Sequence, residues 1–147
     1  MPPPSAGAVL RLWFEEVWNQ RDPDRIATYF APDAVAYALD EAGADAHGPE
    51  AFRVFFERFL ESFSELHFTL HDVVEAGPMA AARWSATLTH SGNGLGVAPT
   101  GTSLIGTSLT ITGMTMARVE DGMIQEGWNE WDRLRLATQC GMLVPAG

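Results

Sequence analysis

The amino-acid sequence predicts an α+β domain in which a strongly curved, cone-shaped antiparallel sheet carries helices on one face. Two observations support this fold class. Apolar residues recur at helical spacing before residue 63, whereas apolar and polar residues alternate over long stretches after it. Helices followed by a run of long strands are typical of α+β proteins, and strands of this length curl. The 147 residues are therefore expected to form one domain, residues 1–147, shaped like an α+β barrel with a hollow mouth.

Two helices are expected near the N-terminus. Ser5 can cap the first helix, and Asp22 followed by Pro23 provides the cap and the first residue of the second. Pro32 ends the second helix, and residues 34–39 are expected to form the first strand. The apolar stripe of the first helix consists of Val9, Leu10, Trp13, Phe14 and Val17.

A third helix is expected to begin at Pro49-Glu50. Its broad apolar face consists of Phe52, Phe55, Phe56, Phe59, Leu60 and Phe63. Phenylalanines at this spacing are typical of a helix packed against a sheet, so we interpret them as core residues in preference to an aromatic ligand site.

Four long strands are expected in the rest of the chain. Residues 66–76 and 79–90 are joined by a turn at Gly77-Pro78, and residues 102–119 and 123–131 by a tight turn at Asp121-Gly122. The glycine-rich residues 91–101 lack the following helix that a phosphate-binding loop needs, so we expect a connection or a lid there. Asp132 is expected to cap a last helix that ends at Gly141.

The composition excludes several functions. The formal net charge is -10 and the chain has no lysine, which disfavours nucleic acids and anionic membranes as partners and excludes a lysine Schiff base. No apolar run is long enough to span a membrane, and no signal peptide is visible, so we expect a cytoplasmic protein. Cys140 is the single cysteine, and we expect it to be a packing residue.

No metal or other cofactor is expected. His67 and His71 lie on a predicted strand. Four residues of a strand span about 13 Å, so these two histidines are too far apart to bind one metal ion. We interpret both as residues of a sheet face or an interface. His90 ends its strand near the expected pocket rim, where it could act as an acid or base, or could be held by a loop carbonyl.

The end of the second hairpin holds the best candidates for a site. One predicted face carries Gln125, Gly127, Asn129 and Trp131, and the other carries Ile124, Glu126, Trp128 and Glu130. Asp132 has two competing roles, as the cap of the last helix or as a carboxyl that exchanges protons with a ligand. The predicted ligand contacts are Asn129, Trp131, Trp128, Trp84, Thr115 and Tyr37.

Several short segments resemble a known family in their order and spacing. They are Tyr29-Phe30-Ala31-Pro32-Asp33, Gly48-Pro49-Glu50-Ala51-Phe52, Thr89-His90-Ser91-Gly92, Pro99-Thr100-Gly101, Thr112-Gly113-Met114, Trp128-Asn129-Glu130-Trp131-Asp132 and Gln139-Cys140-Gly141. In these segments the chain resembles the SnoaL-like polyketide cyclases, which have the nuclear transport factor 2-like fold. The resemblance implies the same curved α+β cone.

The resemblance also implies where the family's functional residues would fall. Its acid-base aspartate on the last strand corresponds to Asn129, and its Gln-x-His pair corresponds to Gly113 and Thr115. All three positions differ here. An asparagine amide cannot exchange a proton near neutral pH, although it can orient a ligand or donate to an oxyanion.

Two functions from different classes remain open. One is a polyketide cyclase-like or isomerase-like enzyme acting on a hydrophobic carbonyl compound, with proton transfer by Asp132 or His90 and with Asn129 polarising the carbonyl. The other is a binding protein that holds an apolar metabolite without catalysis. In both, the partner is a small hydrophobic ligand. A second copy is expected to cover the free face of the sheet, which predicts a homodimer.

Overall fold

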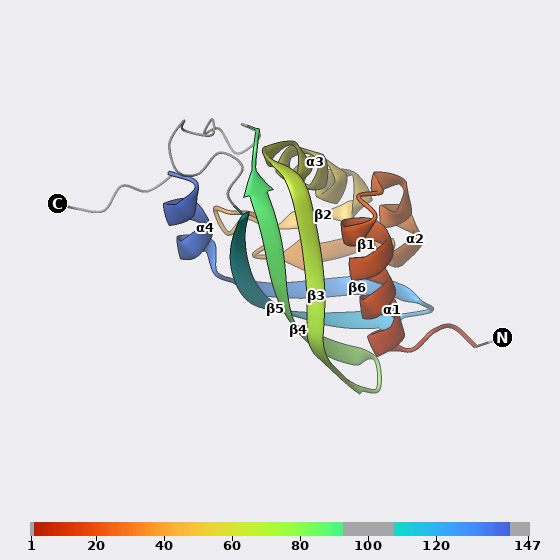
Figure 1. Cartoon of the computed structure of the whole chain (residues 1–147). Coiled ribbons are helices and arrows are strands. Elements are labelled where there is room, and N and C mark those ends of the chain that lie inside the picture. The colour runs from red at the N-terminus through yellow and green to blue at the C-terminus, as the bar shows by residue number, and fades with distance from the viewer. Residues whose placement is uncertain (1, 93–107, 142–147) are drawn as a thin grey trace.

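The computed structural model describes residues 2–92 and 108–141, and Figure 1 shows their arrangement. The helical elements are α1 (Ala6–Leu12), the π-helix η1 (Trp13–Asn19), the 3-10 helix η2 (Pro23–Arg25), α2 (Ile26–Tyr29), α3 (Gly48–Ser62) and α4 (Arg133–Gln139). The strands are β1 (Phe30–Tyr37), β2 (Ala46–His47), β3 (Phe63–Ala76), β4 (Met79–His90), β5 (Ser108–Glu120) and β6 (Met123–Trp131).

The predicted α+β class is confirmed: the long strands curve around one side, which α1, α2 and α3 cover (Figure 1). The strand order is β2-β1-β6-β5-β4-β3. Two details of the prediction are wrong. The sheet is open, with β2 and β3 as its edges, so it is no barrel. The sheet is also mixed, because β1 pairs parallel to β6. Between these two strands the chain passes through α3 and four strands, β2, β3, β4 and β5.

The predicted starts of the first two helical segments are confirmed by their hydrogen bonds. The Ser5 hydroxyl accepts from the Ala8 N–H, and the Asp22 carboxylate accepts from the Asp24 N–H. A further free amide at the start of α1 is satisfied from the sheet, since the Gly7 N–H donates to the Glu75 carboxylate at 2.7 Å. The bond from Gly7 to Glu75 fixes the start of α1 against β3, and η1 follows α1 directly in the chain.

The hairpin between β5 and β6 has the expected turn, with φ values of 53° at Asp121 and 75° at Gly122. Its face alternation differs from the prediction at one residue. The register shifts between Arg118 and Val119, and this irregularity turns Ile124 into the core, where it is 3% exposed. A bulge adds a residue to one strand and so reverses the faces beyond it.

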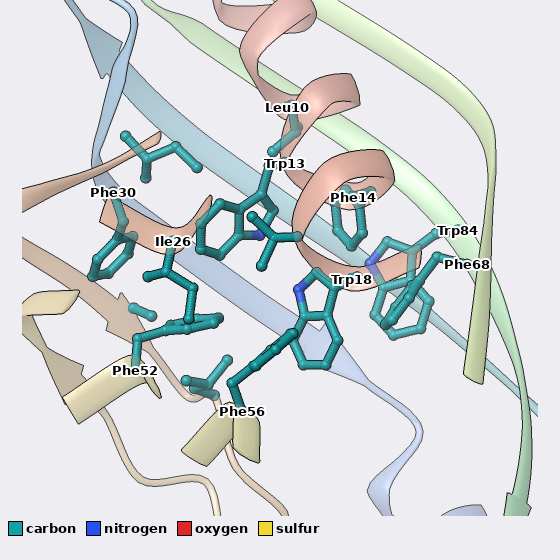
Figure 2. Packing of buried hydrophobic residues seen from close by; sticks show 14 of the residues in the cluster. Leu10, Trp13, Phe14, Trp18, Ile26, Phe30, Phe52, Phe56, Phe68 and Trp84 are labelled. Atoms are coloured by element: carbon teal, nitrogen blue, oxygen red, sulfur yellow. The ribbon is translucent and has the colours of Figure 1, made fainter. Parts of the chain in front are cut away.

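Aromatic side chains from η1 and α3 interlock beneath the sheet (Figure 2). Trp18 lies between Phe56 and Phe68, with ring centroids 4.8 Å and 5.2 Å away. The helix ends at Ser62, so Phe63 belongs to β3 and not to the predicted helical face. The Arg21 guanidinium donates to the carbonyl oxygens of Leu60 and Phe63, which anchors the end of α3.

The described ranges end short of some predicted features. Most of the glycine-rich connection 91–101 and the start of the predicted strand 102–119 lie outside them. Gly92 is described, and a Cβ atom there would lie 2.0 Å from the Glu61 carbonyl oxygen, so close packing explains this glycine. No helix in the described ranges has the length and apolar character that a membrane crossing requires.

Candidate functional site

A cavity of about 60 Å³ lies between the curved sheet and the helices that cover it. Its wall contains the four tryptophans Trp13, Trp18, Trp84 and Trp131. Thr115 and Asn129 are the polar side chains at this wall, and among the described lining residues none is ionisable. The cavity is therefore suited to an uncharged, largely apolar molecule.

The phenylalanines of α3 belong to both the core and the cavity wall. Phe52, Phe55 and Phe59 line the cavity while being at least nine-tenths buried. Figure 2 shows Phe68 and Trp84 near Trp18, and the rings of Phe68 and Trp84 meet edge to face with centroids 4.9 Å apart. The spacing of these phenylalanines could not distinguish a core role from a ligand-facing role, because side chains in either role point toward the inside of the protein.

A chain of hydrogen bonds crosses the polar side of the cavity. The Trp84 indole N–H donates to the Thr115 hydroxyl at 3.0 Å, and that hydroxyl donates to Asn129 Oδ1 at 3.2 Å. Asn129 Nδ2 then donates to the Tyr37 carbonyl oxygen at 3.0 Å. Because the hydroxyl receives one bond and gives the next, the network fixes the orientation of the amide.

Three side chains hold the end of β1 and the residues that follow it, and Asn129 is the first, through its bond to Tyr37. The Trp131 indole N–H donates to the Leu39 carbonyl oxygen at 3.1 Å. The Arg133 guanidinium donates to the carbonyl oxygens of Ala38 and Asp40 and stacks 4.9 Å from the Trp131 ring. These bonds keep Leu39 in the cavity wall after the backbone pairing of β1 has ended.

The structure places Asp132 at the start of α4, where its exposed carboxylate accepts from the Arg135 N–H at 3.0 Å. The predicted capping role is thus present, and the side chain is not among the described lining residues. His90 lies on the same face of β4 as the lining residues Ala86 and Leu88. It is 1% exposed, and among the described residues neither ring nitrogen has a hydrogen-bond partner.

Tyr37 and Trp128 lie on the opposite face of the sheet from the cavity. Their rings stack with centroids 5.7 Å apart. The Tyr37 hydroxyl donates to Glu126, which also accepts from Arg118. The Arg118 guanidinium, and secondly the Tyr37 hydroxyl, lower the pKa of Glu126, and the same carboxylate raises the pKa of Tyr37. Tyr37, Trp128, Glu126 and Arg118 therefore form a cluster on the outer face of the sheet, separate from the cavity.

Of the predicted ligand contacts, Trp84, Thr115, Asn129 and Trp131 lie at the cavity. The wall also includes Trp13, Trp18 and Leu39, which were not predicted as ligand contacts. The two tryptophans occupy inward positions of the first helical stretch. In the sequence, inward residues that line a cavity have the same spacing as residues of a packed core. His67 and His71 are both exposed on the sheet.

An open curved sheet with helices around an apolar cavity defines the nuclear transport factor 2-like class of α+β domains. Within that class the chain belongs to the SnoaL-like polyketide cyclase family, because the profile of this family matches residues 8–140. A comparison with curated proteins gives no significant match.

Solved structures of other proteins show the same fold. IdmH from Streptomyces antibioticus, a candidate polyketide cyclase, is 26% identical with a TM-score of 0.75, over 92% of this chain and 98% of that one. AclR from Streptomyces galilaeus, a candidate hydroxylase, is 23% identical with a TM-score of 0.76, over 96% of this chain and 84% of AclR. A candidate SnoaL-like polyketide cyclase from Jannaschia sp. CCS1 is 20% identical with a TM-score of 0.79, over 95% of this chain and 93% of that protein.

Proposed function

We propose that this protein binds a small, uncharged hydrophobic molecule in the cavity between the sheet and the helices. The observation that carries this proposal is the composition of the wall, which has four tryptophans and two hydrogen-bonded polar side chains. The cavity volume of about 60 Å³ is well below the roughly 300 Å³ of sites for drug-sized ligands. A compound of one ring is therefore the first ligand to test.

The proposal separates binding from the acid-base chemistry that the family resemblance implies. The position of the family's aspartate holds Asn129, whose amide is bonded to Thr115 and Tyr37. Asp132 is exposed and caps α4. Neither residue offers the cavity a carboxyl group, which favours the binding protein over an aspartate-dependent enzyme.

Toluene binding measured by titration calorimetry tests this proposal. Ala86 lines the cavity and Ala81 points to the other face of the same strand, so Ala86→Leu and Ala81→Leu form a matched pair. We expect Ala86→Leu to weaken binding at least about tenfold by filling the site, and Ala81→Leu to leave it unchanged. Equal binding by both variants, or no binding by the unmodified protein, would contradict the proposal.

A second candidate function is proton transfer on a hydrophobic carbonyl compound, and the buried His90 favours it. The imidazole would take a proton from the carbon next to the carbonyl and return one to the same carbon. Deuterium exchange of the acetophenone methyl group, followed by NMR in D₂O, tests this function. Exchange should be faster with the protein and lose that acceleration in His90→Phe. An unaccelerated rate would exclude His90 as a base for this compound.

We also propose that the outer face of the sheet joins two copies of the chain. Met114, Met116 and Trp128 are 54%, 46% and 36% exposed there, and apolar side chains on one surface favour association. Met116→Lys should convert a dimer to a monomer in size-exclusion chromatography with light scattering. Val54→Lys, at an exposed position of α3, is the control. A monomeric unmodified protein would contradict this proposal.

A further inference from the structure

His90 lies one step beyond the cavity along β4. Alternate residues of a strand share a face, and Trp84, Ala86 and Leu88 already line the cavity. His90 is two residues beyond Leu88, which is about 7 Å along a strand. Its ring packs 5.8 Å from Phe63. The Phe63 ring in turn lies 4.8 Å from that of Phe59, a lining residue.

Among the residues that the structure describes, no polar atom compensates the burial of this imidazole. It is 1% exposed, and within the described parts of the chain neither Nδ1 nor Nε2 has a hydrogen-bond partner. A buried polar group that is left unpaired costs about 1–3 kcal/mol, and such groups are rare in folded proteins. A ligand oxygen that reached this imidazole would therefore supply a missing hydrogen bond.

We propose that His90 binds the polar end of the ligand, so that the ligand is a hydroxylated aromatic compound with its ring against the tryptophans and its hydroxyl at the imidazole. A neutral imidazole has one donor and one acceptor nitrogen, and a hydroxyl group can complement either. The described lining residues carry no ionisable group, which favours an uncharged oxygen over a carboxylate. This inference rests on the proposed function, because it assumes that the cavity is occupied.

Phenol and toluene are the probes, since they have the same size and differ in the hydroxyl group. Titration calorimetry gives the affinity of each compound for the unmodified protein, for His90→Phe and for the control His67→Phe, which changes an exposed histidine of β3. The ratio of phenol affinity to toluene affinity should fall about tenfold in His90→Phe, the value of one hydrogen bond. The ratio should not change in His67→Phe.

The outcomes separate the two proposals. Toluene binding with an unchanged ratio in His90→Phe would overturn the role of His90 and leave the proposed function intact. Binding of neither probe would overturn both. A second measurement needs no variant: in protein with ¹⁵N-labelled histidine, phenol should shift the imidazole nitrogen resonances of His90 and toluene should not. Equal shifts with both probes would also overturn the inference.

Discussion

Trp84 covers the backbone of Gly113, its partner across the β4–β5 ladder. A Cβ atom at residue 113 would lie 2.4 Å from Cζ2 and 2.6 Å from Cη2 of this indole, well inside the contact distance of two carbon atoms. The family resemblance places a glutamine at this position. In this chain, an aromatic ring occupies the space that such a side chain would enter, and it forms part of the cavity wall.

Gly113→Ala is expected to destabilise the protein by about 1–3 kcal/mol, because the added methyl group forces Trp84 to move. Gly127→Ala is the matched control, since a Cβ atom there would have its nearest contact at 3.9 Å. The free energy of unfolding from denaturant titration measures both. Combining Gly113→Ala with Trp84→Leu should recover part of the loss. Strictly additive losses would show that the two residues are not coupled.

Asn129→Asp restores the family's carboxyl group and is expected to destabilise the fold by about 1–3 kcal/mol near neutral pH. It replaces the Nδ2 donor that faces the Tyr37 carbonyl oxygen with an oxygen. The folded state then disfavours the ionised form, so the pKa of the new carboxyl rises on folding. Stability is retained below the unfolded pKa of about 3.9 and lost as pH rises through the folded pKa. Denaturant titrations of both proteins at several pH values should show a gap that widens with pH. A constant gap would contradict this explanation.

The capping role of Asp132 predicts different effects for two substitutions. Asp132→Ala removes the acceptor for the Arg135 N–H and should cost about 1 kcal/mol, whereas Asp132→Asn keeps a side-chain acceptor and should cost less. Thermal unfolding followed by circular dichroism measures both. If Asp132→Asn were as damaging as Asp132→Ala, the negative charge and not the cap would be the important property.

Burial raises the pKa of the Cys140 thiol from 9.0 to about 11, so the thiol should be unreactive in the native protein. The buried neutral thiol contributes to the free energy of unfolding below the unfolded pKa. This contribution is lost as pH rises from 9.0 to about 11. A disulfide reagent such as dithionitrobenzoate at pH 8 should label it only after denaturation. Labelling of the native protein at the rate of a small free thiol would contradict this.

The sequence was sufficient for features that depend on local chemistry. The strands 79–90 and 123–131, the Asp121-Gly122 turn and the Asp132 cap were all predicted with the observed residues. Each of them depends on alternation, on positive φ or on a capping oxygen, and these signals act within a few residues.

Features that depend on distant segments could not be predicted. The parallel pairing of β1 with β6 requires the path of the whole chain. Tyr37 and Trp128 were assigned to the ligand, but the strand register places their rings on the outer face. Ile124 faces the core because the pairing of β5 with β6 shifts its register between Arg118 and Val119. No residue pattern in the sequence indicates this shift.

A crystal structure with bound iodobenzene tests the central claim most directly, because anomalous scattering locates the iodine atom. The proposed binding site predicts iodine inside the cone, in contact with at least one of Trp18, Trp84 and Trp131. The signal should disappear in Ala86→Leu and persist in Ala81→Leu. Iodine found only on the outer face, beside Trp128, or an empty cavity at saturating iodobenzene, would contradict the claim that this cavity is the binding site.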